Sequence, residues 1–453
     1  MTVSRAIVFC FAIACLLILL TTGHDDLKIR VAAISALALS IFATRLLPEV
    51  VTSLACFLAF IAIGAASNEV IFSGFASSSF WLLFAGLVIG SAITVTGLGQ
   101  QVAVRIFQHT GNSYSNAALL LALSGLGLGV LVPSTLPRII VLMPISLALA
   151  QTMGYAVGSR GHVGLTITAA ISTLLPTYAI LTANLPTIIH FGAIETLYDI
   201  RPSYAHYFVE QAPVNLVRFL VILALMLPFG ARQTTTRSTV DLPELFTLQQ
   251  KRLLALICVA ILLWATDSWH EVSPAWVGLS LAALLLVPAL GILEPSVMKT
   301  KIDLSPAFFL AAIFAISAVA QTTGLSTAVA DQVIPYLGLE KGHDFRNLLA
   351  ISGVSSLLSH LTTAPAAPAI LAPLAASFAA ETGWTIETVA MAQVIGIATP
   401  FLPYQPPPLI VAIVLAQIPV GTLTRICVIL AVAVIVIGLP VTYVWWSFLG
   451  AFG

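Results

Sequence analysis

Charged residues are scarce in this chain. Asp, Glu, Lys and Arg make up 8% of its 453 residues, hydrophobic residues make up 59%, and the mean hydropathy is +1.06. A soluble protein carries about 25% charged residues, so this composition predicts a polytopic membrane protein embedded in the lipid bilayer. The 18 basic and 18 acidic residues give zero net charge, which argues against nucleic acid as a partner.

Patterns typical of enzymes and metal proteins are missing as well. The five cysteines show no metal-ligand spacing and lie inside apolar runs, where they act as small hydrophobic residues. All eighteen acidic residues fall in predicted loops or at the ends of predicted spans, so no embedded carboxylate pair is available for acid–base catalysis. We therefore expect no enzyme activity, no cofactor and no metal ion beyond sodium. The chain also lacks a soluble domain, which argues against a sensor, and a span with repeated charge, which argues against a channel.

Two stretches in different halves of the chain, residues 124–137 and 352–365, share Ser, Gly, Thr and Pro at the same places. Each stretch is apolar, breaks at a pair of hydroxyl residues, and resumes after a proline. The hydroxyl pairs are Ser134 with Thr135, and Thr362 with Thr363.

The arms of these stretches are too short to cross a membrane. The two arms of the first stretch are residues 116–131 and 139–150. Read as helices, they span about 24 and 18 Å, whereas the hydrocarbon core is about 30 Å thick. We predict two re-entrant helical hairpins, at residues 115–150 and 347–382. Irregular backbone is tolerated at mid-membrane depth only inside protein or beside a water-filled cavity, so we expect both tips to form one cavity.

Two long apolar segments, residues 163–194 and 387–416, contain prolines that a straight helix cannot accommodate. Proline removes a backbone donor and bends the preceding turn, so both segments are expected to unwind near the middle of the membrane. Proline-rich breaks at matching places of two repeats indicate the binding site of a transporter. The polar or irregular residues at these breaks are Thr182, Asn184, Tyr404, Gln405 and Pro407.

The whole chain is predicted to be an all-α polytopic membrane protein, with about eleven spans plus the two hairpins in two inverted repeats. Residues 27–230 form the first repeat and residues 252–453 the second, joined by a cytoplasmic linker at 231–251. Each repeat holds five spans and one hairpin, an odd number of crossings, so the second repeat is inverted. With the N-terminus in the cytoplasm and the C-terminus outside, eleven Lys and Arg lie inside and five outside, as the positive-inside rule requires.

An extra N-terminal span is predicted at residues 1–26. Its apolar run, residues 6–20, follows Arg5 and is short enough to resemble a signal-peptide core. No small-residue cleavage pattern follows it, which favours an uncleaved span.

Arg138 is the most exceptional side chain because it is a cation at a predicted hairpin tip. A buried cation in a membrane is costly and indicates function, although a long side chain can also extend toward water at a hairpin end. Arg218, seven residues into a predicted span, is interpreted as such an interface residue. His360 precedes the second tip and could carry a proton, or serve as a hydrogen-bonded packing residue.

The second arm of each hairpin would begin at the tip. The positive ends of these two helices would then point into the cavity, and helix N-termini of this kind bind anions. The hydroxyl residues at the tips could bind the anion or simply cap the helices.

These features together resemble the divalent anion:sodium symporter family of the ion-transporter superfamily. In that family the tips carry Ser-Asn-Thr and a Leu-Pro-Ile-like exit, and the broken spans carry Thr-Pro-Pro-Asn-like turns. Residues 143–145 and 372–374 match the exits, and residues 184–186 and 404–408 match the turns loosely. This alignment places Ser134 on the family serine, whereas Thr135 stands where the family has asparagine.

The resemblance implies a homodimeric secondary active transporter of small anions that works by an elevator motion in the bacterial plasma (inner) membrane. The substrates would be di- or tricarboxylates, sulfate or a sulfonate, with arsenite-type efflux or hydroxy-acid uptake as alternatives in the superfamily. In the family, sodium ions at the tips supply positive charge beside the anion. Because the tip asparagines are absent here, we expect Arg138 to take that role, with Na⁺ or H⁺ as the possible coupling ion. Candidate substrate-binding residues are Ser134, Thr135, Arg138, Thr182, Asn184, Thr362, Thr363, Tyr404, Gln405 and Pro407, and candidate coupling-ion residues are Ser134, Thr135, Thr363 and His360.

Overall fold

The structure, a computed structural model, describes residues 27–99, 101–102, 113–132, 135–230, 246–294 and 296–452. Every regular element in these ranges is a helix, which confirms the predicted all-α polytopic membrane fold. Eight of the described helices are long and apolar enough to cross a membrane, or nine if the bent pair α20 (Pro368–Thr382) and α21 (Ile386–Ile397) is one span. The count of eleven spans and the inverted repeat stay predictions. The span predicted at 1–26 and most of the linker predicted at 231–251 lie outside the described residues.

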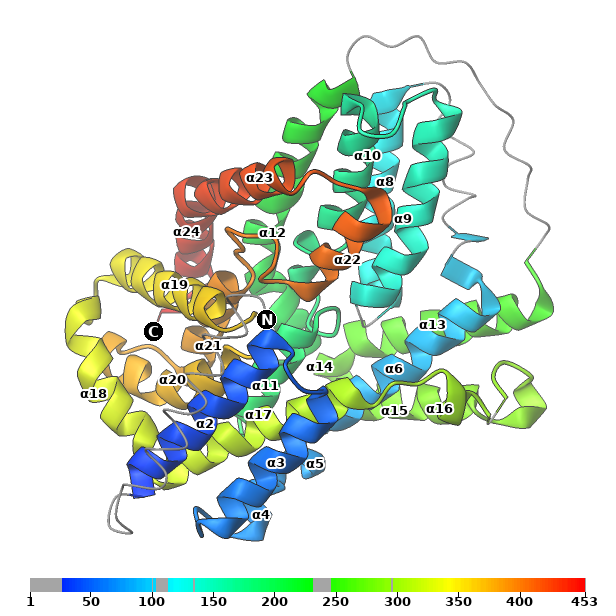
Figure 1. Ribbon diagram of the computed structural model, residues 1–453. Coiled ribbons are helices and arrows are strands. Elements are labelled where there is room, and N and C mark those ends of the chain that lie inside the picture. Colours follow the sequence, from blue (N-terminus) through cyan, green and yellow to red (C-terminus); the bar gives the residue numbers. More distant parts are fainter. Residues whose placement is uncertain are drawn as a thin grey trace.

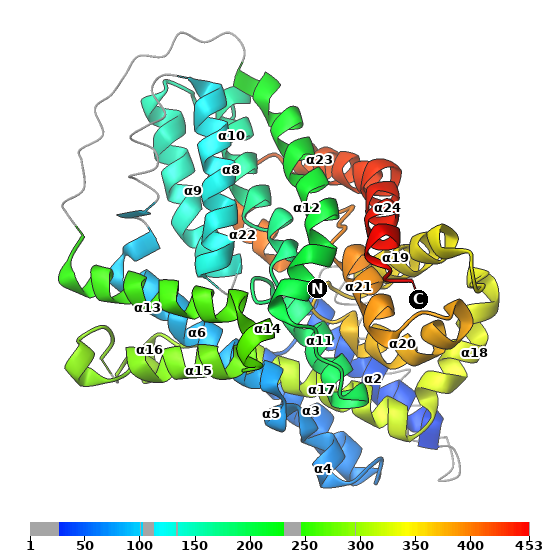
Figure 2. The same cartoon turned by 180° about the vertical axis from the view of Figure 1, so that it is seen from behind.

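Helices from the two halves of the chain lie side by side in one part of the molecule (Figures 1 and 2). The helix α6 (Ser78–Thr96) packs along α15 (Pro274–Leu285), and α3 (Glu49–Ala62) packs along α17 (Ser305–Thr322). Of the α17 span, 72% is buried, because helices of both halves surround it. The other helices of this part are α2 (Leu27–Thr44), α4 (Asn68–Ile71), α5 (Ser73–Ala76), α13 (Leu248–Ala265), α14 (Asp267–His270), η3 (Pro288–Leu290) and α16 (Val297–Thr300).

The region of the first predicted hairpin consists of α8 (Tyr114–Leu131) and α9 (Thr135–Thr152), which pack against each other and against α10 (Arg160–Ser172). The second arm begins at Thr135 instead of residue 139, so it is longer than predicted. Both α8 and α9 have 18 residues and are long and apolar enough to cross a membrane, so the expectation that these arms are too short is wrong, and the re-entrant form of this hairpin stays a prediction. Gly125 lets α8 approach α10 closely, because a Cβ atom there would lie 2.5 Å from Ser172 Oγ. Small residues at such contacts are typical of helix packing in membranes.

The region of the second predicted hairpin consists of α19 (Asp344–Leu361) and α20, and α18 (Leu325–Leu337) precedes it. The second arm begins at Pro368, so Pro365 lies in the turn before the helix and not in its first turn as expected. The first arm packs closely along α21 because residue 396 is glycine. A Cβ atom on Gly396 would lie 2.1 Å from the carbonyl oxygen of Ser352.

Both long apolar segments are interrupted. In the first, a short 3-10 helix, η1 (Pro176–Ala179), separates α10 from α11 (Leu185–Tyr198); in the second, nine non-helical residues separate α21 from α22 (Pro407–Ala416). The parts after the breaks pack crosswise: α11 lies against α20, and α22 lies against α9, as Figure 1 shows for α22. The Tyr198 hydroxyl of α11 lies within hydrogen-bond distance of two carbonyl oxygens of α20, at 3.2 and 3.0 Å. Each half of the chain therefore supports the hairpin of the other half.

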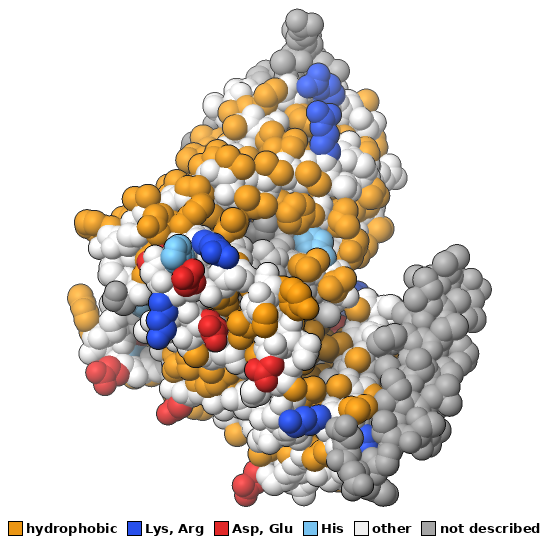
Figure 3. Space-filling view, turned by 90° about the vertical axis from the view of Figure 1, so that its left-hand side faces the viewer, with side chains coloured by type: hydrophobic (Ala, Val, Ile, Leu, Met, Phe, Trp, Pro, Cys, Tyr) orange, Lys and Arg blue, Asp and Glu red, His pale blue; other side chains and the backbone are white. Residues whose placement is uncertain are grey.

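The remaining helices are α12 (Tyr204–Met226) with η2 (Leu227–Gly230), and the final run of α23 (Val420–Ala433), the π-helix η4 (Val434–Gly438) and α24 (Leu439–Leu449). The helix α12 packs against α24 and η4. Figure 3 shows hydrophobic side chains over the upper part of one face, whereas charged side chains gather in its lower part and near its upper edge. Such a broad apolar surface suits contact with lipid.

Candidate functional site

One cavity of about 520 Å³ reaches both hairpin tips and both breaks. Its walls include Thr135 and Thr363 from the two tips, together with Tyr178 and Pro406 from the two breaks. Figure 1 shows that these elements are far apart in the sequence but converge in the fold. The lining includes exposed as well as buried residues, so the cavity is open to the surface. The exposed charged residues are Arg45, Lys301 and Asp303, and Glu49 is half-buried beside them.

Three helices begin at the wall of this cavity. The first residues of α9, α11 and α22 line it, at positions 135–137, 185–186 and 407–408. The first turn of a helix carries the positive end of the helix dipole and presents its unpaired backbone N–H groups, so it attracts anions. Residues 406–408 are prolines without N–H groups, and the Leu409 N–H is bonded to the Pro406 carbonyl, so α22 contributes only its dipole. The starts of α9 and α11 can also present N–H groups to a small anion.

Arg138 lies in the first turn of α9, behind the cavity wall, and its side chain is fully buried. Its Nη2 atom donates to Thr135 Oγ1 at 2.8 Å, to the Ala183 carbonyl at 2.7 Å and to Asn184 Oδ1 at 3.1 Å. Ala183 and Asn184 belong to the first break, so the guanidinium joins the first hairpin to the first broken segment. The alternative that Arg138 extends toward water is wrong, because the side chain has no exposed surface.

Further hydrogen bonds stabilise the arrangement around Asn184. Thr135 Oγ1 donates to Asn184 Oδ1 at 2.9 Å, and Asn184 Nδ2 donates to Thr177 Oγ1 at 3.1 Å. Thr135 is the member of this network that reaches the cavity. Thr182 is buried in the same break but does not line the cavity, and Ser134 lies outside the described residues.

At the second tip and break, Thr363 and Pro407 line the cavity, whereas Thr362 and Tyr404 do not. The Thr362 hydroxyl donates to the Leu358 carbonyl at 2.7 Å, and the half-exposed Tyr404 donates to the His360 carbonyl at 3.4 Å. Gln405 is fully buried, and its side-chain amide has no hydrogen-bond partner among the described residues. A buried amide without partners is costly, so Gln405 is suited to contact water or a ligand.

His360 lies beside a separate cavity of about 280 Å³ and joins the second hairpin to the second break. Its Nδ1 atom is 2.6 Å from the Ser356 carbonyl, and its Nε2 atom accepts from the Phe401 N–H at 3.0 Å. Both ring nitrogens of His360 are therefore engaged by the protein backbone, and its role as a coupling-ion residue stays a prediction.

Arg218 is a second buried arginine, in contrast to the prediction from the sequence. Arg218 is 1% exposed, so its assignment to the membrane interface is wrong. Its Nη2 atom donates to the Ile395 carbonyl at 3.0 Å and to Thr399 Oγ1 at 2.9 Å, and its Nη1 atom donates to Asn215 Oδ1 at 2.7 Å. A cation is favourable there because α21 ends beside it. The spacing of three between Asn215 and Arg218, which places both on one face of α12, was the available signal.

Comparison with known proteins assigns this architecture to a family. A family model described as the sodium:sulfate symporter transmembrane region matches residues 1–452. The chain belongs to this family. The resemblance predicted from the hairpins and breaks is therefore confirmed, and membership of a transporter family agrees with the expectation that the chain is not an enzyme.

The relatives with similar sequences share about a quarter of their residues with this chain. A protein from Cupriavidus necator named only as a membrane protein is 24% identical over 344 residues, which cover 73% of this chain and 66% of that protein. An L-tartrate/succinate antiporter of Escherichia coli strain K12 is 25% identical over 276 residues, which cover 56% of this chain and 54% of that protein. The match thus spans about half to two thirds of the length of these relatives.

Two solved transporter structures share the fold. The Alcanivorax borkumensis YdaH transporter superposes with a TM-score of 0.60 at 17% identity, over 85% of this chain and 89% of that one. The Neisseria gonorrhoeae MtrF efflux pump superposes with a TM-score of 0.57 at 15% identity, over 83% of both chains. At these identities the likeness concerns the fold alone.

Proposed function

We propose that this protein is a secondary active transporter that binds one small dianion, such as a dicarboxylate, in the cavity between the two hairpin tips. The observation that carries the proposal is the convergence of three helix N-termini and two hydroxyl-bearing tips on one cavity. Tricarboxylates, sulfate and sulfonates have the same chemistry of clustered anionic oxygens. The name of the Escherichia coli relative, an L-tartrate/succinate antiporter, supports a dicarboxylate and favours exchange.

In this proposal the substrate contacts Thr135 and Thr363 at the tips, and Gln405 provides a further donor behind the wall. Arg45 and Lys301 are exposed residues of the cavity lining, where they would attract an anion from solution. By the charge count of the sequence these residues lie on the cytoplasmic side, so we assign the cavity to an inward-open state.

The proposed motion is an elevator. The hairpins and broken segments would move as one unit against α3, α6, α15 and α17, and these last helices would belong to the scaffold of a homodimer. The hydrogen bonds from Arg138 to the first break support a unit that moves without losing its internal geometry.

Sodium independence is the further part of the proposal. Three oxygens from Thr135, Ala183 and Asn184 surround Arg138 Nη2, and hydroxyl, carbonyl and amide oxygens at a broken helix are the kind of group that coordinates Na⁺ in transporters. Here a guanidinium occupies these acceptors and supplies a fixed positive charge beside the anion. The bound anion would then need no sodium ion for charge compensation.

The test is uptake of labelled succinate and sulfate into proteoliposomes loaded with unlabelled anion, in sodium, potassium or choline buffer. We expect equal exchange in all three buffers for the wild type and loss of exchange in Arg138→Gln. The matched control is Arg201→Gln, since Arg201 is a half-exposed arginine three residues after α11, where it pairs with Glu195. Strict sodium dependence of the wild type, or an active Arg138→Gln protein, would contradict the sodium-independent mechanism.

A thermal-shift screen against a panel of small anions tests the binding claim separately. A ligand that binds only the folded state adds about 2.7 kcal/mol to the free energy of unfolding when its concentration is a hundred times its Kd, and the melting temperature rises accordingly. If no di- or tricarboxylate, sulfate or sulfonate stabilises the protein or is transported, the proposed function is wrong.

A further inference from the structure

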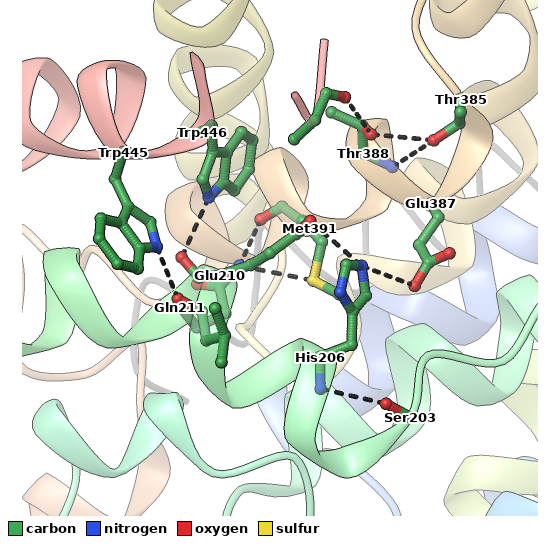
Figure 4. A network of polar contacts seen from close by, with 12 residues as sticks. Ser203, His206, Glu210, Gln211, Thr385, Glu387, Thr388, Met391, Trp445 and Trp446 are labelled. Atoms are coloured by element: carbon green, nitrogen blue, oxygen red, sulfur yellow. Dashed lines mark hydrogen bonds and ion pairs between the residues drawn. The ribbon is translucent and has the colours of Figure 1, made fainter. Parts of the chain in front are cut away.

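Three titratable side chains meet at the beginning of α12 and α21 (Figure 4), and none of them lines the cavity. His206 Nε2 lies 3.2 Å from Glu210 Oε1 and 3.5 Å from Glu387 Oε1. His206 and Glu210 occupy adjacent turns of α12, and Glu387 comes from the first turn of α21. The side chain of His206 is 49% exposed, so the imidazole is in contact with solvent while it faces both carboxylates.

Glu210 is the unusual member of this cluster, because a carboxylate is rarely buried unless it is paired. Its side chain is 4% exposed, and its Oε2 atom has no hydrogen-bond partner among the described residues. Glu210 was predicted to lie in a loop or at the end of a span; in the structure it lies in the second turn of α12, with its side chain buried. Indole N–H groups of Trp445 and Trp446 donate to the carbonyls of Val209 and Glu210, so α24 covers this side of the cluster (Figure 4).

The other charged groups near this end have different partners. Arg201 pairs with Glu195 at 2.9 Å, and Asp267 accepts from the Tyr204 backbone N–H at 2.5 Å. Arg218 lies two turns further along α12 and bonds the end of α21. The described part of the chain has no group of three or more His, Cys, Asp or Glu side chains arranged to hold a metal ion. Glu210 and Glu387 thus have His206 as their ion-pair partner in the described structure.

We propose that His206, Glu210 and Glu387 form a proton-binding site that controls transport from outside the cavity. The free imidazole takes one proton from solution at Nδ1, while its Nε2–H faces the two carboxylates. The formal charge of the cluster changes from two negative charges to one, and no other bond forms or breaks. Two carboxylates stabilise the imidazolium, and the buried charge of Glu210 gains the counterion that it otherwise lacks.

Next to this site, two hydrogen bonds join α12 to α21 and α21 to the second hairpin. One residue after Glu210, Gln211 Nε2 donates to the Met391 carbonyl of α21 at 2.9 Å. Two residues further along α21, Gln393 Nε2 donates to the Leu371 carbonyl of α20 at 2.9 Å. Protonation that tightens the contact between α12 and α21 is therefore transmitted to an arm of the hairpin. This role rests on the proposed transport function, whereas proton binding itself does not.

The first experiment measures proton binding without transport. The melting temperature of the purified protein is recorded from about pH 5 to pH 8, the range in which histidine titrates, for the wild type, His206→Gln and Glu210→Gln. Because the folded state stabilises the imidazolium, the wild type should gain stability over His206→Gln at low pH and lose that gain as the pH rises. The melting temperature of Glu210→Gln should depend less on pH than that of the wild type, because one of the two carboxylates that stabilise the imidazolium is removed.

The matched control is His343→Gln. His343 is 56% exposed and lies 3.5 Å from Glu340, which is 62% exposed, so it reproduces the ion pair without a buried carboxylate. Its melting profile should run parallel to that of the wild type. A His206→Gln profile that is also parallel to the wild type at every pH overturns the proton site. If Glu210→Gln does not fold, Glu387→Gln replaces it as the test of proton binding, because Glu387 is the partly exposed carboxylate of the cluster.

The second experiment measures the role of the site. Exchange of labelled succinate or sulfate is followed in proteoliposomes at fixed inner pH while the outer pH varies. We expect the wild-type rate to change several-fold across the histidine range and the His206→Gln rate to stay flat. A wild-type profile that His206→Gln retains overturns control of transport by this site. Absence of any anion transport, with the pH-dependent melting difference intact, instead rejects the proposed function and leaves the proton site established.

Discussion

Glycine residues on α8 determine how closely the first hairpin approaches its broken segment. A Cβ atom on Gly129 would lie 2.4 Å from Thr177 Cγ2 and 2.8 Å from Arg138 Nη1, whereas a Cβ atom on Gly127 would meet nothing within 4 Å. Gly129→Ala should therefore destabilise the protein by about 1–3 kcal/mol through overpacking. Gly127→Ala on the same helix should be neutral or stabilising, by up to about 1 kcal/mol.

The measurement is thermal unfolding of both variants under identical conditions. Gly129→Ala should also weaken anion binding, because the displaced groups belong to the Arg138 network behind the cavity. Equal melting temperatures for the two variants would mean that α8 does not pack as closely on η1 as the structure indicates.

Hydroxyl groups at the two tips provide a second prediction at the scale of single residues. Thr135→Val and Thr363→Val should each weaken anion binding about tenfold, since each removes one hydrogen-bonding group worth about 1–2 kcal/mol at the cavity wall. Isothermal titration with the anion selected by thermal shift measures the loss. Thr424→Val is the control, because Thr424 is exposed and bonds its own helix at Val420. Unchanged affinity in both tip variants would place the anion elsewhere.

At the scale of elements, the sequence predicted the parts of the molecule that proline and paired hydroxyl residues mark. The break before Leu185 and the break before Pro407 lie where proline prevents a continuous helix. The second arm of the second hairpin begins at Pro368, later than predicted. The prediction placed Pro365 in the first turn, because that proline also fits the start of a helix. Hydrogen-bond partners decide between such prolines, and they are not visible in the sequence.

Contacts between helices distant in the sequence account for what the sequence did not reveal. The burial of Arg218 depends on α21, whose last turns supply its acceptors. The cluster of His206 and Glu210 becomes a site only because Glu387 joins it from a helix about 180 residues away, counted in the sequence. These helices are apolar on nearly all sides, so hydrophobic periodicity does not show which face meets a partner.

The orientation of the elements across the membrane is a separate prediction. A cysteine introduced at residue 236 should react with a membrane-impermeant reagent only from the cytoplasm, and one at residue 342 only from outside. The physical reason is the odd number of crossings in each predicted repeat, which inverts the second repeat. Labelling of both cysteines from the same side would contradict the inverted repeat.

At the scale of the whole molecule, the two halves of the chain depend on each other. The helix α11 of the first half lies against α20 of the second, and α22 of the second half lies against α9 of the first. A chain cut between residues 231 and 245 should therefore assemble into an active transporter when both pieces are produced together. Each piece produced alone should be degraded or aggregate, which affinity purification and anion exchange measure. Activity of a single piece would contradict this interdependence.

The crosswise packing of α11 on α20 and α22 on α9 also has an evolutionary consequence. If the halves arose by duplication of one gene, the ancestral polypeptide had to pair with an identical copy in the opposite orientation to cover the same grooves. Such a chain would have needed to insert into the membrane both ways round. After fusion that requirement disappeared, and each half became free to acquire its own buried arginine: Arg138 beside the first break and Arg218 beside the second.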